Sequence, residues 1–242
     1  MAKRFFKVRS CIASVLCIAS LSAVSAQAFS DVSPNAYYKT AVDWAASEGI
    51  TSGSDKEHFS PDKLCSRAQT VTFLWRANGS PAVSGNNPFT DVAPEDYFYQ
   101  AVLWAVQNGV TSGTSATEFS PYKQVTRAQV ATFLHRAAGS PNPQSMARFA
   151  DVSSSAYYAN AVSWAAASGI TTGTSASAFS PDKGCTRAEI ATFLYRSKNG
   201  STQTTKPEPA PEPTPQVTEK PVSDLTKLDE KKEETKPEIV ES

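Results

Sequence analysis

The sequence is poor in the residues that metal sites and nucleic-acid surfaces require. It has two histidines and no Cys-x-x-Cys pair, which leaves little material for a zinc site. Its 23 Lys and Arg balance its 23 Asp and Glu, and residues 29–200 alone carry 13 of each sign. Because phosphate binding needs a concentrated cationic field, we expect no nucleic-acid partner. We also expect no metal and no cofactor.

Long hydrophobic runs are also missing, and the one near the N-terminus is short. Basic residues up to Arg9 precede an apolar run at Cys11–Ala19, and small residues in an Ala-Gln-Ala pattern end at Ala28. A bilayer span needs about 20 apolar residues, whereas this order is typical of a secretory signal peptide. The sequence therefore predicts a signal peptide at 1–28 and a secreted mature chain with no membrane span.

An internal repeat of 60 residues organises the rest of the chain. A shift of 60 aligns equivalent residues in three copies: Asp31, Asp91 and Asp151; Trp44, Trp104 and Trp164; Gly53, Gly113 and Gly173; Arg67, Arg127 and Arg187. Each copy is too small to bury much core alone, so the copies should pack on each other. The predicted domains are repeats at 29–88, 89–148 and 149–200.

Each repeat is predicted to form two helices separated by a structured loop. In the first repeat the earlier helix is expected over about 36–48, with Gly49 as a left-handed cap. The later helix should follow Ser66, because Ser or Thr with Gln or Glu three residues on is a capping box. Thr126 and Thr186 begin the same pattern in the other repeats. The predicted fold class is therefore all-α, with helical repeats and structured loops.

Signal cleavage would leave two cysteines, Cys65 and Cys185, at equivalent positions. An oxidising compartment would allow a disulfide between them. The second repeat has Val125 at the matching position. This favours a role for both cysteines as small buried hydrophobic residues.

The segment 201–242 differs from the repeats in composition. It holds seven of the sixteen prolines, no aromatic residue, and six Lys against ten Asp and Glu. Such a segment cannot bury enough apolar surface to offset its chain entropy. We therefore expect a disordered, acidic tail.

The main functional clue is a charged residue in an unusual place. Helix N-termini carry partial positive charge and prefer acidic neighbours, yet Arg67, Arg127 and Arg187 each start a predicted helix. An anion site would explain this, because free N–H groups, the helix dipole and a planar guanidinium can converge on one carboxylate or phosphate. The alternative is a packing salt bridge with an aspartate such as Asp31. The residues alone leave both open.

The repeated tryptophans and glycines also allow two interpretations. Trp44, Trp104 and Trp164 lie on a predicted amphipathic helix, where a large aromatic is more often core. An aromatic face beside Arg and Asp can also hold a sugar ring. The glycines, such as Gly53, either supply turn geometry or let the backbone approach a ligand closely.

Taken together, these motifs resemble S-layer homology domains. The resemblance rests on five segments, each occurring three times within 29–200: Phe-x-Asp-Val, Ala-Val-x-Trp-Ala, Gly-Ile/Val-Thr-x-Gly, Phe-Ser-Pro and Ser/Thr-Arg-Ala-Gln/Glu. It implies a pseudo-threefold spindle of helices around a central bundle. It also implies noncovalent attachment to secondary cell-wall polysaccharide, often carrying a pyruvate ketal on an amino sugar. The third repeat matches best, since Gln69 and Gln129 stand where the family has Glu, and Ser66 where it has Thr.

The resemblance assigns the ligand contact to Arg67, Arg127 and Arg187. We add as candidate binding residues the aligned aspartates, tryptophans and glycines: Asp31, Asp91, Asp151, Trp44, Trp104, Trp164, Gly53, Gly113 and Gly173. The expected partner is secondary cell-wall polysaccharide or a peptidoglycan-linked glycan. The expected location is the cell wall and cell surface, in association with an S-layer.

Two other functions compete with glycan binding. The repeats would be a surface scaffold if the acidic tail recruited a partner protein. Catalysis has little support, because His58 and His135 occupy non-equivalent repeat positions and no nucleophile motif is recognisable. We therefore expect a binding module that is not an enzyme.

Overall fold

The computed structural model describes residues 29–147 and 149–200, so the predicted signal peptide and tail lie outside the described residues. Within these ranges, secondary structure consists of six helices and three isolated β-bridges. The helices are α1 (Lys39–Ser47), α2 (Arg67–Ala77), α3 (Tyr99–Gln107), α4 (Arg127–Ala137), α5 (Ala159–Ala167) and α6 (Arg187–Asn199). The all-α prediction is confirmed. None of these helices has the length and apolar character needed to cross a membrane.

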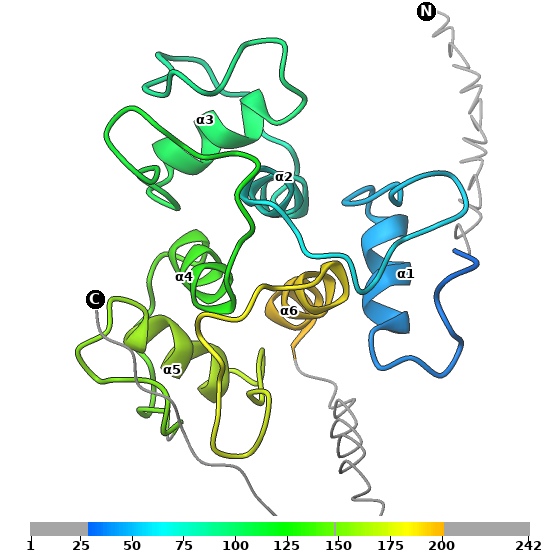
Figure 1. Cartoon of the computed structure of the whole chain (residues 1–242), viewed down its shortest axis with the longest axis vertical. Coiled ribbons are helices and arrows are strands. Elements are labelled where there is room, and N and C mark those ends of the chain that lie inside the picture. Colours follow the sequence, from blue (N-terminus) through cyan, green and yellow to red (C-terminus); the bar gives the residue numbers. More distant parts are fainter. Residues whose placement is uncertain (1–28, 148, 201–242) are drawn as a thin grey trace, which may run out of the picture. The chain divides into compact units, whose positions relative to one another are not determined.

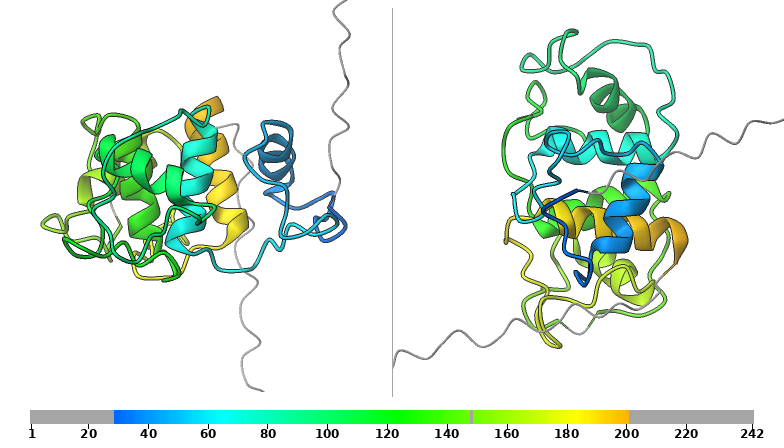
Figure 2. Two further views of the ribbon diagram at one scale, coloured as in Figure 1. Left: turned by 90° about the horizontal axis from the view of Figure 1, so that it is seen from above. Right: turned by 90° about the vertical axis from the view of Figure 1, so that its right-hand side faces the viewer.

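The later helices of the three repeats, α2, α4 and α6, lie together in the centre, and the earlier helices surround them (Figure 1). Each outer helix packs mainly on the central helix of another repeat: α3 on α2, α5 on α4, and α1 on α6. Figure 2 shows α2 and α6 side by side from two directions. The last pair closes the ring, so the predicted pseudo-threefold bundle is confirmed.

A closed triangle of backbone hydrogen bonds joins the repeats. Cys65 N–H donates to Cys185, Cys185 to Val125, and Val125 to Cys65, each over 3.0 Å. All three residues are fully buried, and both cysteines are free thiols, as Val125 indicated. Burial raises the pKa of the Cys65 thiol to about 12. Because buried backbone groups need partners, the three repeats depend on one another at this point.

Helix boundaries follow the local sequence signals at the start of the later helices and at the end of α1. Ser66, Thr126 and Thr186 form the predicted capping boxes, with both reciprocal bonds present. Gly49 has φ +68° after α1, as expected of a left-handed cap.

The start of α1 differs from the prediction by three residues. Ala36 N–H donates to Ser33, and Lys39 N–H to Ala36, so the chain makes two tight turns before the helix begins at Lys39. Tyr38 at the N-cap offers no capping side-chain bond. Because the apolar pattern begins at Tyr38 and Asn35 resembles an N-cap, the expected helix was extended into these turns.

Candidate functional site

The three arginines at the starts of the central helices are buried inside the neighbouring repeat. Arg67, Arg127 and Arg187 are 3%, 2% and 4% exposed. Their Nε atoms donate to backbone carbonyls of another repeat: Arg67 to Phe119 (2.9 Å), Arg127 to Phe179 (2.9 Å) and Arg187 to Phe59 (2.7 Å). Each arginine therefore spans a junction between two repeats.

Each guanidinium also lies between two phenylalanine rings. The Cζ of Arg67 is 4.9 Å from the centroid of Phe119 and 5.4 Å from that of Phe133. Arg127 and Arg187 have equivalent pairs of rings at 4.8–5.3 Å. Burial lowers the pKa of Arg67 and Arg187, but an arginine remains charged in proteins. The rings and the carbonyl fix the orientation of a buried cation.

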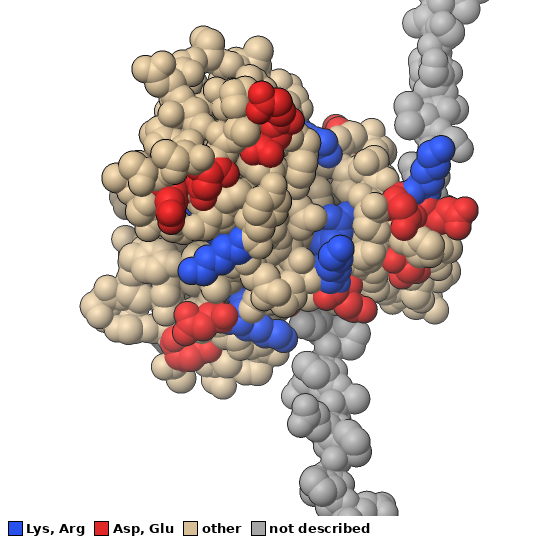
Figure 3. Space-filling view, turned by 45° about the horizontal axis from the view of Figure 1, so that its top comes forward, with Lys and Arg blue, Asp and Glu red and all other residues tan. Residues whose placement is uncertain are grey.

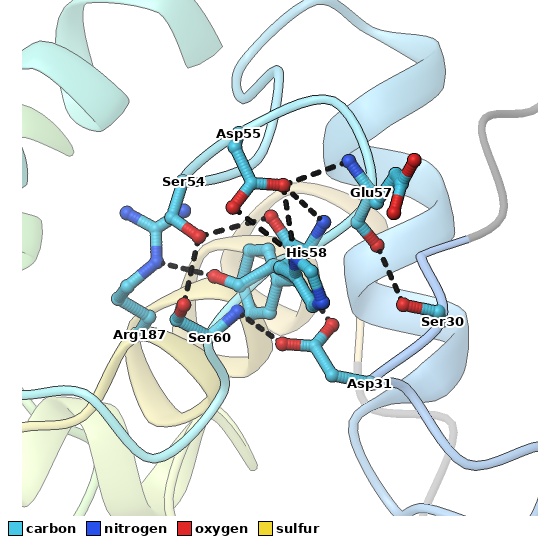
Figure 4. A network of polar contacts seen from close by, with 9 residues as sticks. Ser30, Asp31, Ser54, Asp55, Glu57, His58, Ser60 and Arg187 are labelled. Atoms are coloured by element: carbon cyan, nitrogen blue, oxygen red, sulfur yellow. Dashed lines mark hydrogen bonds and ion pairs between the residues drawn. The ribbon is translucent and has the colours of Figure 1, made fainter.

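The aligned aspartates hold the loops that receive the arginines. Asp31 accepts hydrogen bonds from the backbone N–H groups of Phe59 (2.8 Å) and Ser60 (2.7 Å) (Figure 4). Asp91 and Asp151 hold their own loops in the same way. In the part of the chain that the structure describes, no aspartate of this set forms an ion pair with these arginines. The predicted salt bridge with an aspartate is therefore absent, although Arg127 pairs with Glu189 over 3.0 Å. A ligand contact by the aspartates stays a prediction.

The glycine of each loop is required by the turn. Gly53 has φ +89°, and a Cβ there would lie 2.4 Å from the Asp55 carbonyl and 2.6 Å from the Phe29 ring. Gly113 and Gly173 have the same surroundings. Turn geometry alone thus explains these glycines, and their contact with a ligand stays a prediction.

The helix N–H groups are occupied, which corrects one expectation. Arg67 N–H donates to Lys123 and Ala68 N–H to Pro121, each over 2.9 Å, and the Ser66 hydroxyl accepts from Gln69. The other central helices repeat this pattern. The expectation that free N–H groups help to bind an anion is therefore wrong, because the neighbouring repeat supplies backbone acceptors. The guanidinium remains as the group that can recognise an anion.

A groove of about 320 Å³ lies in front of Arg187, and we call it the Arg187 groove. Its lining includes the turn 51–54, Lys63, Gln69, Arg76, Tyr97 and Arg187. All three repeats contribute, because the turn and α2 belong to the first repeat, Tyr97 to the second and Arg187 to the third.

An equivalent groove surrounds Arg127 and is lined by the turn 171–173, Glu189, Arg196 and Tyr37, among others. This Arg127 groove measures about 20 Å³. At the third repeat junction, burial raises the pKa of Tyr157, whereas the charge of Arg67 lowers it.

The tryptophans pack against the core. Trp104 is 6% exposed in the main hydrophobic cluster, and Trp44 and Trp164 are partly buried against it. No tryptophan lines the Arg187 or Arg127 groove. Their predicted contact with a sugar is untested, and the core interpretation accounts for their burial.

Two tyrosines that line the grooves, Tyr37 and Tyr97, were not among the sequence candidates. Tyr37, Tyr97 and Tyr157 recur with the same period of 60. Tyr97 and Tyr157 are 61% and 67% exposed. The period of 60 in these tyrosines is visible in the sequence, but their exposure depends on how the repeats pack.

Charges of both signs are interspersed on the face drawn in Figure 3. In the described residues no cluster of three metal-ligating side chains occurs. The positive charges of the candidate site are instead the buried side chains of Arg67, Arg127 and Arg187 at the repeat junctions.

Comparison with known proteins agrees with this architecture. The family model described as "S-layer homology domain" matches residues 28–71, 88–131 and 148–191. The chain is 31% identical over 80% of its length to the surface-layer 125 kDa protein of Lysinibacillus sphaericus. It is 28% identical over 88% of its length to an S-layer protein of Bacillus thuringiensis subsp. finitimus, and 32% identical over 50% to an endoglucanase of Bacillus sp. strain KSM-635. The matched regions cover 17%, 27% and 13% of those proteins.

Proposed function

Because the chain belongs to the S-layer homology domain family, and is thus a secreted protein associated with the cell wall, we propose that its grooves bind an anionic secondary cell-wall polysaccharide. The three repeats are an anchoring module of the cell surface. The ligand that we propose is a carboxylate-bearing sugar, such as an amino sugar with a pyruvate ketal.

The observation that carries this proposal is a buried cation with unused donors. The Nη2 atom of Arg67 is buried and has no hydrogen-bond partner among the described residues. Arg187 Nη2 donates to the Thr51 hydroxyl over a long distance of 3.4 Å. A buried charged donor without an acceptor is costly. A carboxylate would supply acceptors with the planar, two-pronged geometry that suits a guanidinium.

The Arg187 groove has the dimensions and chemistry for one sugar residue. Its volume of about 320 Å³ is at the lower end of small-molecule sites. Lys63 and Arg76 add positive charge, and Tyr97 offers an exposed aromatic face at the edge. An apolar face beside directed polar groups is the combination by which proteins hold sugar rings.

Sedimentation with purified, protein-free cell wall tests the proposal. We expect the protein to sediment with wall and to stay in the supernatant after the pyruvate ketals have been removed by mild acid. A surface scaffold whose tail recruits a partner protein would stay in the supernatant with both the untreated and the acid-treated wall. Hydrolysis of the wall glycan by the protein would instead support an enzyme.

The arginines are tested by the triple variant Arg67→Ala, Arg127→Ala and Arg187→Ala. Loss of a charge-assisted hydrogen bond should weaken each binding groove by about tenfold to a hundredfold. The matched control is Lys39→Ala, Lys56→Ala and Lys198→Ala, which changes the net charge equally away from the grooves. Both variants are checked for helicity by circular dichroism. A folded arginine variant that sediments like the control would place the ligand elsewhere.

A further inference from the structure

The second repeat carries an exposed aromatic side chain that the other two repeats lack at the matching position. Tyr122 stands directly after the Phe-Ser-Pro segment of the second repeat, where the first and third repeats have Asp62 and Asp182. Tyr122 is 75% exposed, more than any other large hydrophobic side chain in the residues that the structure describes. Burial of its own ring therefore does not explain why an aromatic residue stands there.

Tyr122 and Tyr97 flank the same buried ring. The ring centroid of Phe98 lies 5.0 Å from that of Tyr97 and 5.9 Å from that of Tyr122, and both contacts are nearly perpendicular, at 85°. Phe98 is fully buried, whereas Tyr97 is largely exposed and lines the Arg187 groove. Tyr122 therefore continues an aromatic surface outward from this groove. We call the two side chains the Tyr97–Tyr122 rim.

Packing on Phe98 accounts for only a part of the Tyr122 side chain. A perpendicular contact covers little of the ring, and most of it stays in water. Tyrosine combines an apolar ring with a polar hydroxyl, and it is enriched where proteins contact their partners. Exposed apolar surface that adjoins a groove is a mark of a ligand site. The position of Tyr122 thus indicates contact with a ligand that extends beyond the groove.

The exchange of Asp for Tyr also removes a negative charge from the edge of the groove. In the third repeat, burial raises the pKa of Tyr157, and the neighbouring Tyr158 and Asp182 raise it further, so a carboxylate acts on that tyrosine. In the second repeat, the residue that matches Asp182 is the uncharged Tyr122. A carboxylate at the edge would repel an anionic polymer. The edge beside Tyr97 lacks this repulsion and offers a ring instead.

We propose that the Tyr97–Tyr122 rim holds the sugar residue next to the carboxylate-bearing sugar of the polymer. The inference rests on the proposed function and extends it. Arg187 fixes the carboxylate, and the tyrosine rings pack on the apolar face of the neighbouring pyranose ring. The occupant is therefore an oligosaccharide of at least two residues, with its anionic sugar in the Arg187 groove. The first and third repeats lack this second subsite, because Asp62 and Asp182 replace the aromatic ring.

Side-chain NMR of Arg187 measures binding in this groove alone. The Nε–H signal of Arg187, assigned by its loss in Arg187→Lys, is followed while one of two probes is added to the whole protein. The first probe is the methyl glycoside of a pyruvylated N-acetylhexosamine. The second is the disaccharide in which this sugar is linked to an uncharged N-acetylhexosamine. We expect the disaccharide to bind about tenfold more tightly, because it alone reaches the rim.

Substitution of Tyr122 tests the second subsite. Tyr122→Asn removes the ring, so the disaccharide should lose most of its tenfold advantage while the affinity for the monosaccharide is kept. Tyr122→Leu keeps an apolar cover over Phe98 but has no flat ring, so the same loss is expected even if Tyr122→Asn fails to fold. Tyr122→Phe keeps the ring and the advantage. The matched control is Asp182→Asn, which places the same residue at the matching position of the third repeat and should keep the advantage.

The results separate this inference from the proposed function. Equal affinities of the wild type for the two probes, or an undiminished disaccharide advantage in folded Tyr122→Asn or Tyr122→Leu, would overturn the inference and leave the wall-binding function intact. Loss of the advantage in Asp182→Asn would also overturn it, because the effect would not be specific to the rim. An Arg187 signal that responds to neither probe would overturn it as well, and sedimentation with cell wall then decides whether the proposed function stands.

Discussion

The Arg187 and Arg127 grooves share a backbone but differ in chemistry. In both, an aspartate holds the loop, a phenylalanine carbonyl accepts the arginine Nε, and a capping box starts the adjoining helix. In the Arg127 groove, however, Glu189 compensates the guanidinium, whereas Gln69 in the Arg187 groove does not. Equal backbone geometry in two repeats therefore does not ensure equal side-chain contacts around their arginines.

The difference also shows which residues belong to the scaffold. The aspartates, loop glycines and capping residues act alike in all three repeats, so their substitution should affect stability wherever it is made. Substitution at residue 69, 129 or 189 should have effects that depend on the repeat.

The largest effect is expected where the grooves differ. Glu189→Ala removes one partner of a buried ion pair, and such a loss costs about 3–5 kcal/mol of unfolding free energy. Gln69→Ala removes only the reciprocal half of a capping box and should cost about 1 kcal/mol. Urea denaturation of both variants measures the contrast. Equal destabilisation by the two would argue against a special role for the Arg127–Glu189 pair.

A smaller effect, the same in every repeat, is expected at the loop glycines. Gly53→Ala and Gly173→Ala each place a Cβ within 2.6 Å of a backbone carbonyl at positive φ, and strain of this kind costs about 1–3 kcal/mol. Gly49→Ala is the control, since its φ is +68° but a Cβ there meets nothing within 4 Å. In thermal unfolding, Gly49→Ala should lower the melting temperature less than Gly53→Ala or Gly173→Ala. A larger loss in Gly49→Ala would contradict the steric explanation.

A still smaller scaffold effect is expected at the helix caps. Ser66→Ala, Thr126→Ala and Thr186→Ala each remove a side-chain acceptor from a helix start. Each should cost about 1 kcal/mol, measured as the free energy of unfolding in urea. Because the cap is local, the three values should agree within the error of the measurement. A spread of several kcal/mol would mean that the caps also support the grooves unequally.

The smallest effect is expected in a contact unique to the first repeat. A hydrogen bond to Asp55 raises the pKa of the exposed His58. The stabilisation from this contact is present below the unfolded pKa of histidine and is lost as pH rises through the folded value. Asp55→Asn should return the His58 pKa toward its ordinary range in an NMR titration. An unchanged titration would show that Asp55 does not set that pKa.

Local spacing was enough to predict much of the fold. The Ser66, Thr126 and Thr186 caps and the Gly49 terminus depend on interactions within a few residues, and the structure contains them. The burial of Cys65 and Cys185 followed from Val125, because equivalent positions in a repeat share surroundings.

Contacts between repeats could not be predicted in the same way. That Arg187 meets Phe59, 128 residues earlier, depends on how the ring closes. For the same reason, the occupation of the Arg67 N–H by Lys123 was not foreseen. Tyr97 was overlooked because its position in a groove arises only when another repeat packs beside it.

Side-chain NMR of the arginines tests the central claim most directly. The Nε–H signals of Arg67, Arg127 and Arg187, assigned by single substitutions to Lys, are followed as the pyruvylated glycoside is added to the whole protein. The account predicts that the signal of Arg187, which lines the larger groove, shifts with the same saturation curve as binding. Binding that leaves the Arg187 signal unchanged would contradict the account.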